Sequence, residues 1–177
     1  MKDVLQAMEE RFSTRGYTPE KLTEEELNTL LRAGLQAPTA ANRQEIHFTV
    51  IPGDAPILGE IQAEMLRLRG VEQTPPHNFC YEAPVVILLS GDAGFGWTPV
   101  DAGIAAENIA LAAESLGLGS LIIGCIKDAL TGEKKDYFNA ALQLPENYLY
   151  QVAVAVGHGA ASKAPHEYSF EKNVTLL

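Results

Sequence analysis

Residues 98–117 read TPVDAGIAAENIALAAESLG, and this stretch is the clearest guide to the fold. It predicts a helix with Thr98 as its N-cap, Pro99 as its first residue and Gly117 just past its end. Seven alanines and glycines between positions 102 and 113 make the helix small and apolar on nearly every side. A helix that is apolar all round is normally buried. We therefore expect it to be central, or packed tightly against a second subunit.

Hydrophobic patterns on either side of this stretch predict a mixture of helices and strands. Thr23 and Glu26 have the spacing of a capping box, so a helix begins there and ends before Pro38. The apolar run 84–90 predicts a strand buried on both faces, and 149–156 predicts a last, alternating strand. The order has no regular βαβ alternation, which favours an α+β fold over a doubly wound sheet. The other predicted elements are helices at 3–10, 56–69 and 133–142 and strands at 47–51 and 120–123.

Length and composition fit a single domain over residues 1–177, with 46% hydrophobic residues to form its core. A net charge of −10 argues against binding to nucleic acid or to an anionic membrane. The apolar runs are too short to span a bilayer and the N-terminus has no signal-peptide pattern, so we expect a cytoplasmic protein. Cys80 and Cys125 are predicted to be reduced core thiols.

The common catalytic motifs are missing from the sequence. No glycine pattern matches a dinucleotide-binding or P-loop motif, and no GxSxG or HExxH motif occurs. The four histidines are scattered without metal-ligand spacing, so we expect no metal site. If the protein is an enzyme, a bound organic cofactor is expected to supply the chemistry.

The stretch Arg11-Phe12-Ser13-Thr14-Arg15 concentrates positive charge in an otherwise acidic chain. If it is extended, residues 11, 13 and 15 point the same way, and two guanidinium groups and a hydroxyl could bind phosphate or another anion. If it is helical, Arg11 and Arg15 still share a face but Ser13 does not. The alternative without a ligand is a solvated basic surface paired with Glu9 and Glu10.

A second stretch, residues 37–44 (APTAANRQ), joins a predicted helix to a predicted strand. Thr39, Asn42 and Gln44 offer hydroxyl and amide groups on a loop of otherwise small residues. Such a loop can lie against a flat polar heterocycle, and the alternative is an ordinary surface turn.

These two stretches together resemble the FMN-dependent nitroreductase family, in which Arg-x-Ser-x-Arg precedes Ala-Pro-Thr-x-x-Asn-x-Gln by about 25 residues. Residues 101–108 (DAGIAAEN) and 116–124 (LGLGSLIIG) are similar to two further family motifs, and Val156-Gly157-His158 is similar to the family's Leu-Gly-Tyr strand end. The resemblance covers the whole chain, with its motifs in the family's order.

This resemblance implies an α+β subunit with a central, mostly antiparallel sheet flanked by helices, which works as an interlocked homodimer. It implies one FMN in each of two clefts at the dimer interface. Arg11 and Ser13 would hold the phosphate and ribityl end, and Arg15 would lie near the N1 and O2 edge of the flavin. The partner subunit would contribute Pro38, Thr39, Ala40 and Asn42. The backbone at Ile122, Ile123 and Gly124 would pass the ring, with an N–H directed at N5. The alternative for these glycines is a simple helix cap and turn.

Some positions depart from the family pattern. Many members continue with Pro and Trp where Glu45 and Ile46 stand here, so we expect a different cleft wall. A C-terminal Lys or Arg usually completes the phosphate site, and Lys163 and His166 are both candidates. Asn78 is a candidate for contact with the pyrimidine ring. The chain is also short for the family, which predicts an open substrate site.

The function implied by the resemblance is that of an FMN-dependent oxidoreductase. It would take hydride from NAD(P)H and pass the electrons to a small acceptor such as a nitroaromatic, a quinone or an activated alkene. The alternatives are an FMN-binding carrier or sensor with little turnover, and an unrelated interaction domain without a cofactor. Neither the acceptor nor the choice of NADH or NADPH follows from the residues.

Overall fold

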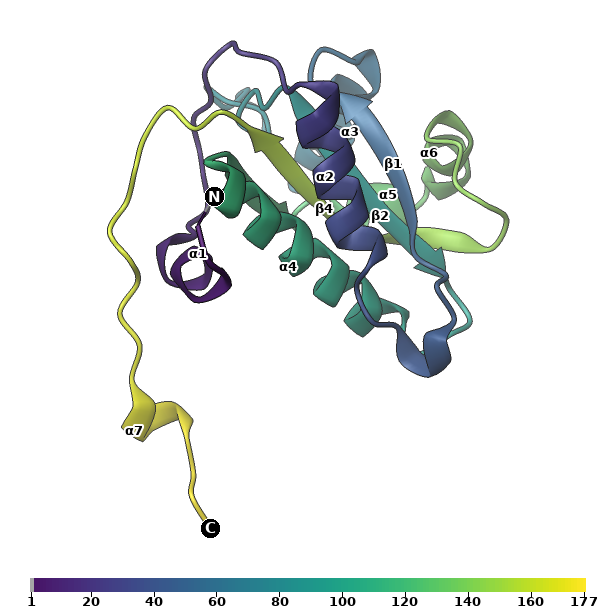
Figure 1. Ribbon diagram of the computed structural model, residues 1–177. Coiled ribbons are helices and arrows are strands. Elements are labelled where there is room, and N and C mark those ends of the chain that lie inside the picture. Colours follow the sequence, from purple (N-terminus) through teal and green to yellow (C-terminus); the bar gives the residue numbers. More distant parts are fainter. Residues whose placement is uncertain (1) are drawn as a thin grey trace.

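The structure is a computed structural model that describes residues 2–177, and it consists of a four-stranded antiparallel sheet with helices on both faces (Figure 1). The strand order is β1-β2-β4-β3. The predicted mixed α+β fold is confirmed. The strands are β1 (His47–Pro52), β2 (Val85–Asp92), β3 (Gly119–Ile123) and β4 (Tyr148–Gly157), and the helices are α1 (Val4–Glu10), α2 (Glu24–Leu35), the short η1 (Ala40–Asn42), α3 (Pro56–Leu68), α4 (Thr98–Leu116), α5 (Lys127–Thr131), α6 (Lys135–Ala141) and α7 (Phe170–Asn173).

The two central strands divide the interior into two cores. On β4, Ala153 and Ala155 face the core formed with α3, α5 and α6, whereas Val154 and Val156 face the core formed with α2 and α4. The alternation predicted for this strand is therefore present, and each set of side chains buries against a different layer. Within residues 2–177, no helix combines the length and apolar composition that a bilayer crossing requires.

Helix α4 lies centrally along one face of the sheet, as its composition predicts (Figure 1). Close approach to α2 is possible at Gly34, where a Cβ would lie 3.0 Å from a methyl carbon of Ile109. Gly117 ends the helix with a φ of 78°, in the left-handed region that glycine adopts without strain. The predicted N-cap is wrong. Trp97 holds that position, and the Thr98 hydroxyl instead donates to the carbonyl of Asp92 at the end of β2, over 3.0 Å.

Two other expectations need correction. The prediction near 133–142 corresponds to α6, but the short helix α5 before it was not predicted. Cys80 is buried, and burial raises the pKa of its thiol to about 11, but Cys125 is exposed rather than in the core. Glu45 and Ile46 are both buried, and Ile46 packs in the core with α4. Within the described chain, the Glu45 carboxylate has no hydrogen-bond partner.

Helix α3 is anchored by an ion cluster around the carboxylate of Glu64. The Glu64 side chain is 2% exposed, and its carboxylate accepts hydrogen bonds from Arg67 over 2.6 and 2.9 Å. Lys134, just before α6, lies 2.7 Å from the same carboxylate. Arg67 first and Lys134 second lower the pKa of Glu64 to about 2. The cluster therefore ties α3 to the segment that leads into α6.

We predict that this cluster contributes to acid sensitivity. A carboxyl whose pKa drops on folding stabilises the protein above its unfolded-state pKa, and this contribution disappears as pH falls towards the folded-state pKa. Glu64→Gln should lower the thermal unfolding midpoint at pH 7, and its difference from the parent should shrink between about pH 4.5 and pH 2. The matched control is Glu133→Gln, at a side chain that is 85% exposed and also contacts Arg67. A midpoint difference that stays constant over this pH range would contradict the assignment.

Candidate functional site

The segment Arg11–Arg15 runs extended beside the edge strand β3. Ser13 pairs with Ser120 in parallel, and the N–H of Thr14 donates to the carbonyl of Ser120 over 2.9 Å. Thr14 is buried while Ser13 and Arg15 are exposed, so positions 13 and 15 share the outward face. The structure therefore adopts the extended alternative rather than the helical one.

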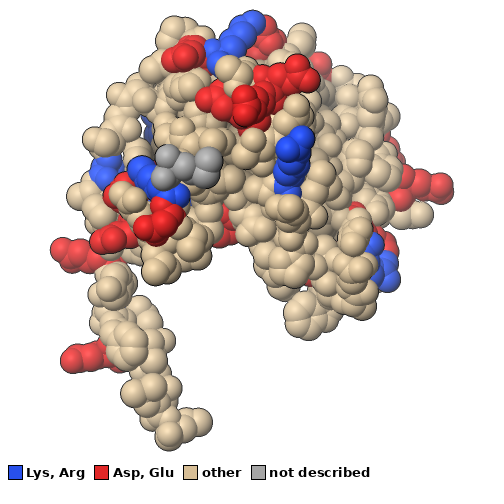
Figure 2. All heavy atoms as spheres, viewed as in Figure 1, with Lys and Arg blue, Asp and Glu red and all other residues tan. Residues whose placement is uncertain are grey.

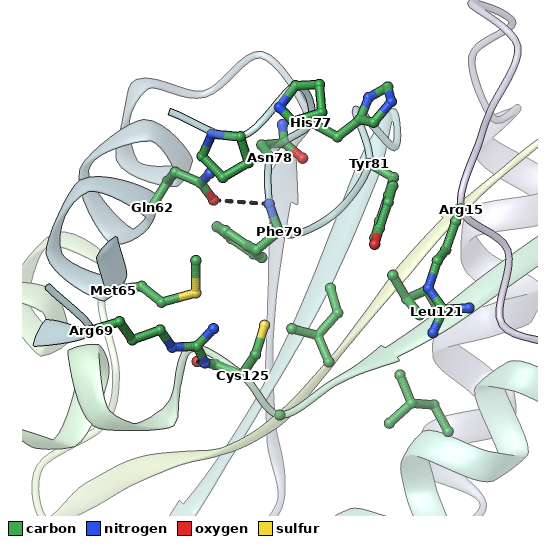
Figure 3. A pocket seen from close by; sticks show the side chains of 15 residues that line it. Arg15, Gln62, Met65, Arg69, His77, Asn78, Phe79, Tyr81, Leu121 and Cys125 are labelled. Carbon is green, nitrogen blue, oxygen red and sulfur yellow. Dashed lines mark hydrogen bonds between the residues drawn. The ribbon is translucent and has the colours of Figure 1, made fainter. Parts of the chain in front are cut away.

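A cavity of about 420 Å³ opens where this segment meets the far end of β3. Figure 3 shows Arg15 on one side of it and Met65 and Arg69 on the opposite side. Three parts of the chain that are separated in sequence meet here, namely Arg15, residues between 62 and 81, and residues 121–125. The cavity thereby brings together five predicted cofactor-binding residues, namely Arg15, Asn78, Ile122, Ile123 and Gly124.

The charge of this cavity is opposite to that of the whole chain. Among the described residues, those that line it include no Asp or Glu, although the chain has 23 of them against 13 Lys and Arg. Two guanidinium groups line it, and that of Arg15 lies 6.0 Å from the ring centroid of Tyr81. His77 at the rim is paired with Glu82 over 2.9 Å. The cavity therefore suits a ligand that carries negative charge.

Asn78 lines the cavity and also holds the turn that follows it. Its side-chain oxygen accepts from the N–H groups of Cys80 and Glu82, each over 3.0 Å. Its own N–H donates to the Glu82 carboxylate over 2.9 Å. Because the side-chain oxygen is engaged, the side-chain NH₂ of Asn78 is the group left to meet a ligand.

The loop at residues 37–44 is held in shape by a buried carboxylate on α4. Asp101 is 2% exposed, and both its oxygens accept from the N–H of Ala40, over 3.1 and 3.0 Å. Thr39 accepts from the N–H of Gln44 over 2.9 Å. Ala41, Asn42 and Gln44 all have φ near 53°, a conformation that costs about 1–2 kcal/mol per residue without glycine. The loop is therefore strained and fixed rather than an ordinary turn.

The predicted site residues fall into separate groups within one chain. Pro38, Thr39, Ala40 and Asn42 lie at the opposite end of α4 from its junction with β3 and do not line the cavity (Figure 1). Arg11 is near the cavity segment but pairs with Glu107 of α4, over 3.2 Å. Lys163 and His166 stand on the exposed C-terminal segment, which runs away from the sheet, and neither lines the cavity (Figure 1). Glu45 and Ile46 do not line it either.

Comparison with known proteins identifies the family. Residues 8–158 match the Nitroreductase family. The chain belongs to the nitroreductase family. It is 29% identical to an FMN reductase (NADPH) of Bacillus subtilis, over 90% of this chain and 67% of the relative.

Solved structures agree with this membership. A nitroreductase with bound FMN from Desulfitobacterium hafniense is 30% identical and superposes with a TM-score of 0.87, covering 100% of this chain and 99% of that one. An FMN-dependent nitroreductase from Clostridium difficile is 27% identical with a TM-score of 0.84, covering 99% of each chain. The family resemblance predicted from the four motifs is confirmed.

In this nitroreductase family member, one wall of the cavity was not predicted. Helix α3 contributes Gln62 and Met65, with Arg69 just after it. The other lining residues that were not predicted are Pro75, Pro76, His77, Phe79, Tyr81, Leu121 and Cys125. The Gln62 side-chain oxygen accepts from the N–H of Phe79 over 2.9 Å and so joins α3 to the loop before β2 (Figure 3). The two prolines at 75 and 76 mark that loop as irregular, which is the one signal in the sequence that points to this wall. Within residues 2–177, no cluster of His, Cys, Asp and Glu is arranged to hold a metal ion.

We predict that Asp101 controls the strained loop. Asp101→Ala removes both acceptors of the Ala40 N–H, and hydrogen bonds to charged groups contribute about 1.5–3 kcal/mol. Amide hydrogen exchange at residues 40–44 should therefore become about tenfold faster or more. Asp101→Asn keeps one acceptor and should show a smaller increase.

The control for this prediction is Ser115→Ala, which removes a bond at the other end of α4, where the hydroxyl donates to the carbonyl of Lys2 over 2.9 Å. Exchange in the loop should not change in this variant. If Asp101→Ala leaves the loop as protected as the parent, another contact holds it.

Proposed function

We propose that the protein is an NAD(P)H-dependent FMN oxidoreductase. We also propose that residues 1–177 form a single FMN-binding domain. The observation that carries the proposal is the cavity beside β3, which combines Arg15, Asn78 and residues 122–124 with a lining free of Asp and Glu in the described chain. Membership of the nitroreductase family and the FMN bound to a similar solved structure support this choice of cofactor.

The residues present fit a flat, anionic cofactor. Ile122 is 39% exposed at the cavity and offers an apolar surface to a ring. Gly124 has no atom within 4 Å of the place where a Cβ would stand, so its backbone is open to close approach. We assign the backbone of residues 122–124 to the ring, the side-chain NH₂ of Asn78 to its polar edge, and Arg15 to the edge where reduction adds negative charge.

The phosphate end is assigned to Arg11 and Ser13. In the structure Arg11 is paired with Glu107, whose side chain is 43% exposed, so a phosphate would compete with that carboxylate for the guanidinium. A bidentate phosphate is a stronger partner for arginine than a solvated carboxylate pair. We propose that Lys163 or His166, on the exposed C-terminal segment, completes this end.

Bound FMN would supply two-electron transfer between NAD(P)H and an acceptor. The role of the protein is to bind and orient the cofactor and to stabilise the charge that develops on it. The guanidinium of Arg15 favours the reduced cofactor because that form carries more negative charge at the adjacent edge. We propose a nitroaromatic, a quinone or an activated alkene as acceptor, and a cytoplasmic location, where NAD(P)H is available.

We further propose that the working form is an interlocked homodimer. The loop at 37–44 is held rigid yet does not line the cavity of its own chain, which suits a loop that serves the partner's cofactor with Pro38, Thr39, Ala40 and Asn42. Much of the surface over α4 on the face in Figure 2 is uncharged. Exposed apolar side chains on α1 and the C-terminal segment, among them Leu5, Phe170 and Leu176, also need cover.

The first test of this function is spectroscopic. The purified protein should be yellow, with an FMN absorbance spectrum and close to one FMN per chain. NADH or NADPH should bleach it, and a quinone or nitroaromatic should restore the colour. Sedimentation should give a homodimer at micromolar concentration. A protein that holds FMN but is not reduced by either dinucleotide is a carrier or sensor, and one without FMN affinity contradicts the proposal.

A second prediction separates the two arginines. Arg11→Ala should weaken the binding of oxidised and reduced FMN about equally, by roughly 2 kcal/mol or more, because the phosphate carries the same charge in both states. Arg15→Ala should weaken the binding of reduced FMN more than that of oxidised FMN and should therefore lower the midpoint potential of the bound flavin. A differential loss of about 1.4 kcal/mol corresponds to about 30 mV for two electrons.

The measurement is a redox titration of both variants beside the parent, in excess FMN. Equal shifts in the two variants, or a shift confined to Arg11→Ala, would mean that the guanidinium groups are assigned to the wrong ends of the cofactor.

A further inference from the structure

Arg69 has no assigned role, yet it lines the cavity opposite Arg15 (Figure 3). It lies one residue beyond α3, and one of its guanidinium nitrogens donates to the carbonyl of Cys125 over 2.7 Å. That bond directs the side chain along the cavity wall. It leaves the remaining N–H groups of the guanidinium available, since arginine presents its donors as a fork.

Arg69 also differs from the arginine next to it in charge pairing. Arg67 is paired with Glu64 and Glu133, whereas Arg69 forms no ion pair with any carboxylate in the described chain. Among the described residues, the Cys125 carbonyl is the one hydrogen-bond partner of its side chain, and it is neutral, so no nearby carboxylate compensates the positive charge. Arg69 is exposed, and in a chain with a net charge of −10 its guanidinium stands at a cavity lining without acidic residues, where it is available to an anionic ligand.

The cavity wall around Arg69 combines apolar side chains with a positive charge. Met65 and Phe79 are apolar, and Gln62 is already bonded to the Phe79 N–H. An aromatic or otherwise flat group can lie against this apolar surface, while an oxyanion on its far side meets the guanidinium. Arg15, which we assign to the cofactor, stands on the opposite side of the cavity from Arg69, while Asn78 lies next to Phe79 (Figure 3).

We infer that Arg69 binds the oxyanion of the substrate that exchanges electrons with the cofactor, and this inference rests on the proposed function. The chemistry is recognition of a carboxylate or phosphate by guanidinium. It has two sources: a carboxylate on the acceptor, which makes the preferred acceptor an aromatic or quinonoid acid, or the pyrophosphate of NAD(P)H.

The test uses the FMN-loaded protein and measures equilibrium binding by perturbation of the flavin absorbance. Benzoate and benzamide form a matched pair that differs in charge, and adenosine diphosphate ribose supplies a pyrophosphate without nicotinamide. In Arg69→Gln, benzoate or adenosine diphosphate ribose should bind about tenfold more weakly, and benzamide should bind as in the parent. Loss for benzoate identifies the acceptor carboxylate as the source, and loss for adenosine diphosphate ribose identifies the dinucleotide.

Two control variants make the result specific. Arg32→Gln makes the same change of charge at an exposed position of α2 that does not line the cavity, and it should leave all three affinities unchanged. Arg69→Lys keeps the charge and should recover part of the loss. If Arg69 only supports the Cys125 carbonyl, the substitution weakens the binding of benzamide as much as the binding of benzoate, and this result overturns the inference.

The outcome is also separable from that of the proposed function. A parent protein without FMN, or with FMN that NAD(P)H does not reduce, contradicts both. Two outcomes overturn the Arg69 assignment alone, provided that NAD(P)H reduces the parent protein normally. In the first, the parent binds neither anion. In the second, the parent and Arg69→Gln bind both anions with the same affinity.

Discussion

Close packing of small side chains along α4 is the constraint on which the rest of the structure depends. Because the alanines allow this helix to lie against both the sheet and α2, its remaining side chains can hold other segments. Asp101 fixes the loop at Ala40, and Asn108 donates to the carbonyl of Ala33 in α2 over 3.1 Å. Glu107 pairs with Arg11, so one rigid helix sets the spacing between the loop and the N-terminal segment.

The sequence predicts the elements that carry strong local signals. The capping box at Thr23 and Glu26 is present with both reciprocal bonds, because it needs only residues of a single turn. The continuous run of β2 and the alternation of β4 also report burial directly. The N-cap predicted at Thr98 is wrong because a tertiary bond to Asp92 takes its hydroxyl, and local spacing cannot reveal such a bond.

The candidate site was predictable only in part, and for a similar reason. Arg15 and residues 122–124 belong to recognisable motifs, so their meeting at one cavity follows from the family resemblance. Gln62 is a half-buried polar residue of α3 and Arg69 is an exposed one just after it, and no periodicity distinguishes such positions from ordinary surface positions. The bond from Ala40 to Asp101 spans 61 positions, and a single sequence contains no sign of such a pairing.

The division of the site residues between the two ends of α4 has a thermodynamic consequence. If each cavity is completed by the loop of a second chain, cofactor binding and assembly are linked equilibria, and each must strengthen the other by the same factor. The apparent FMN affinity then depends on protein concentration, and free FMN shifts the monomer–dimer equilibrium towards the dimer by mass action. A cell that makes little of this protein, or has little FMN, would hold inactive monomers in reserve, and activity would rise more steeply than expression.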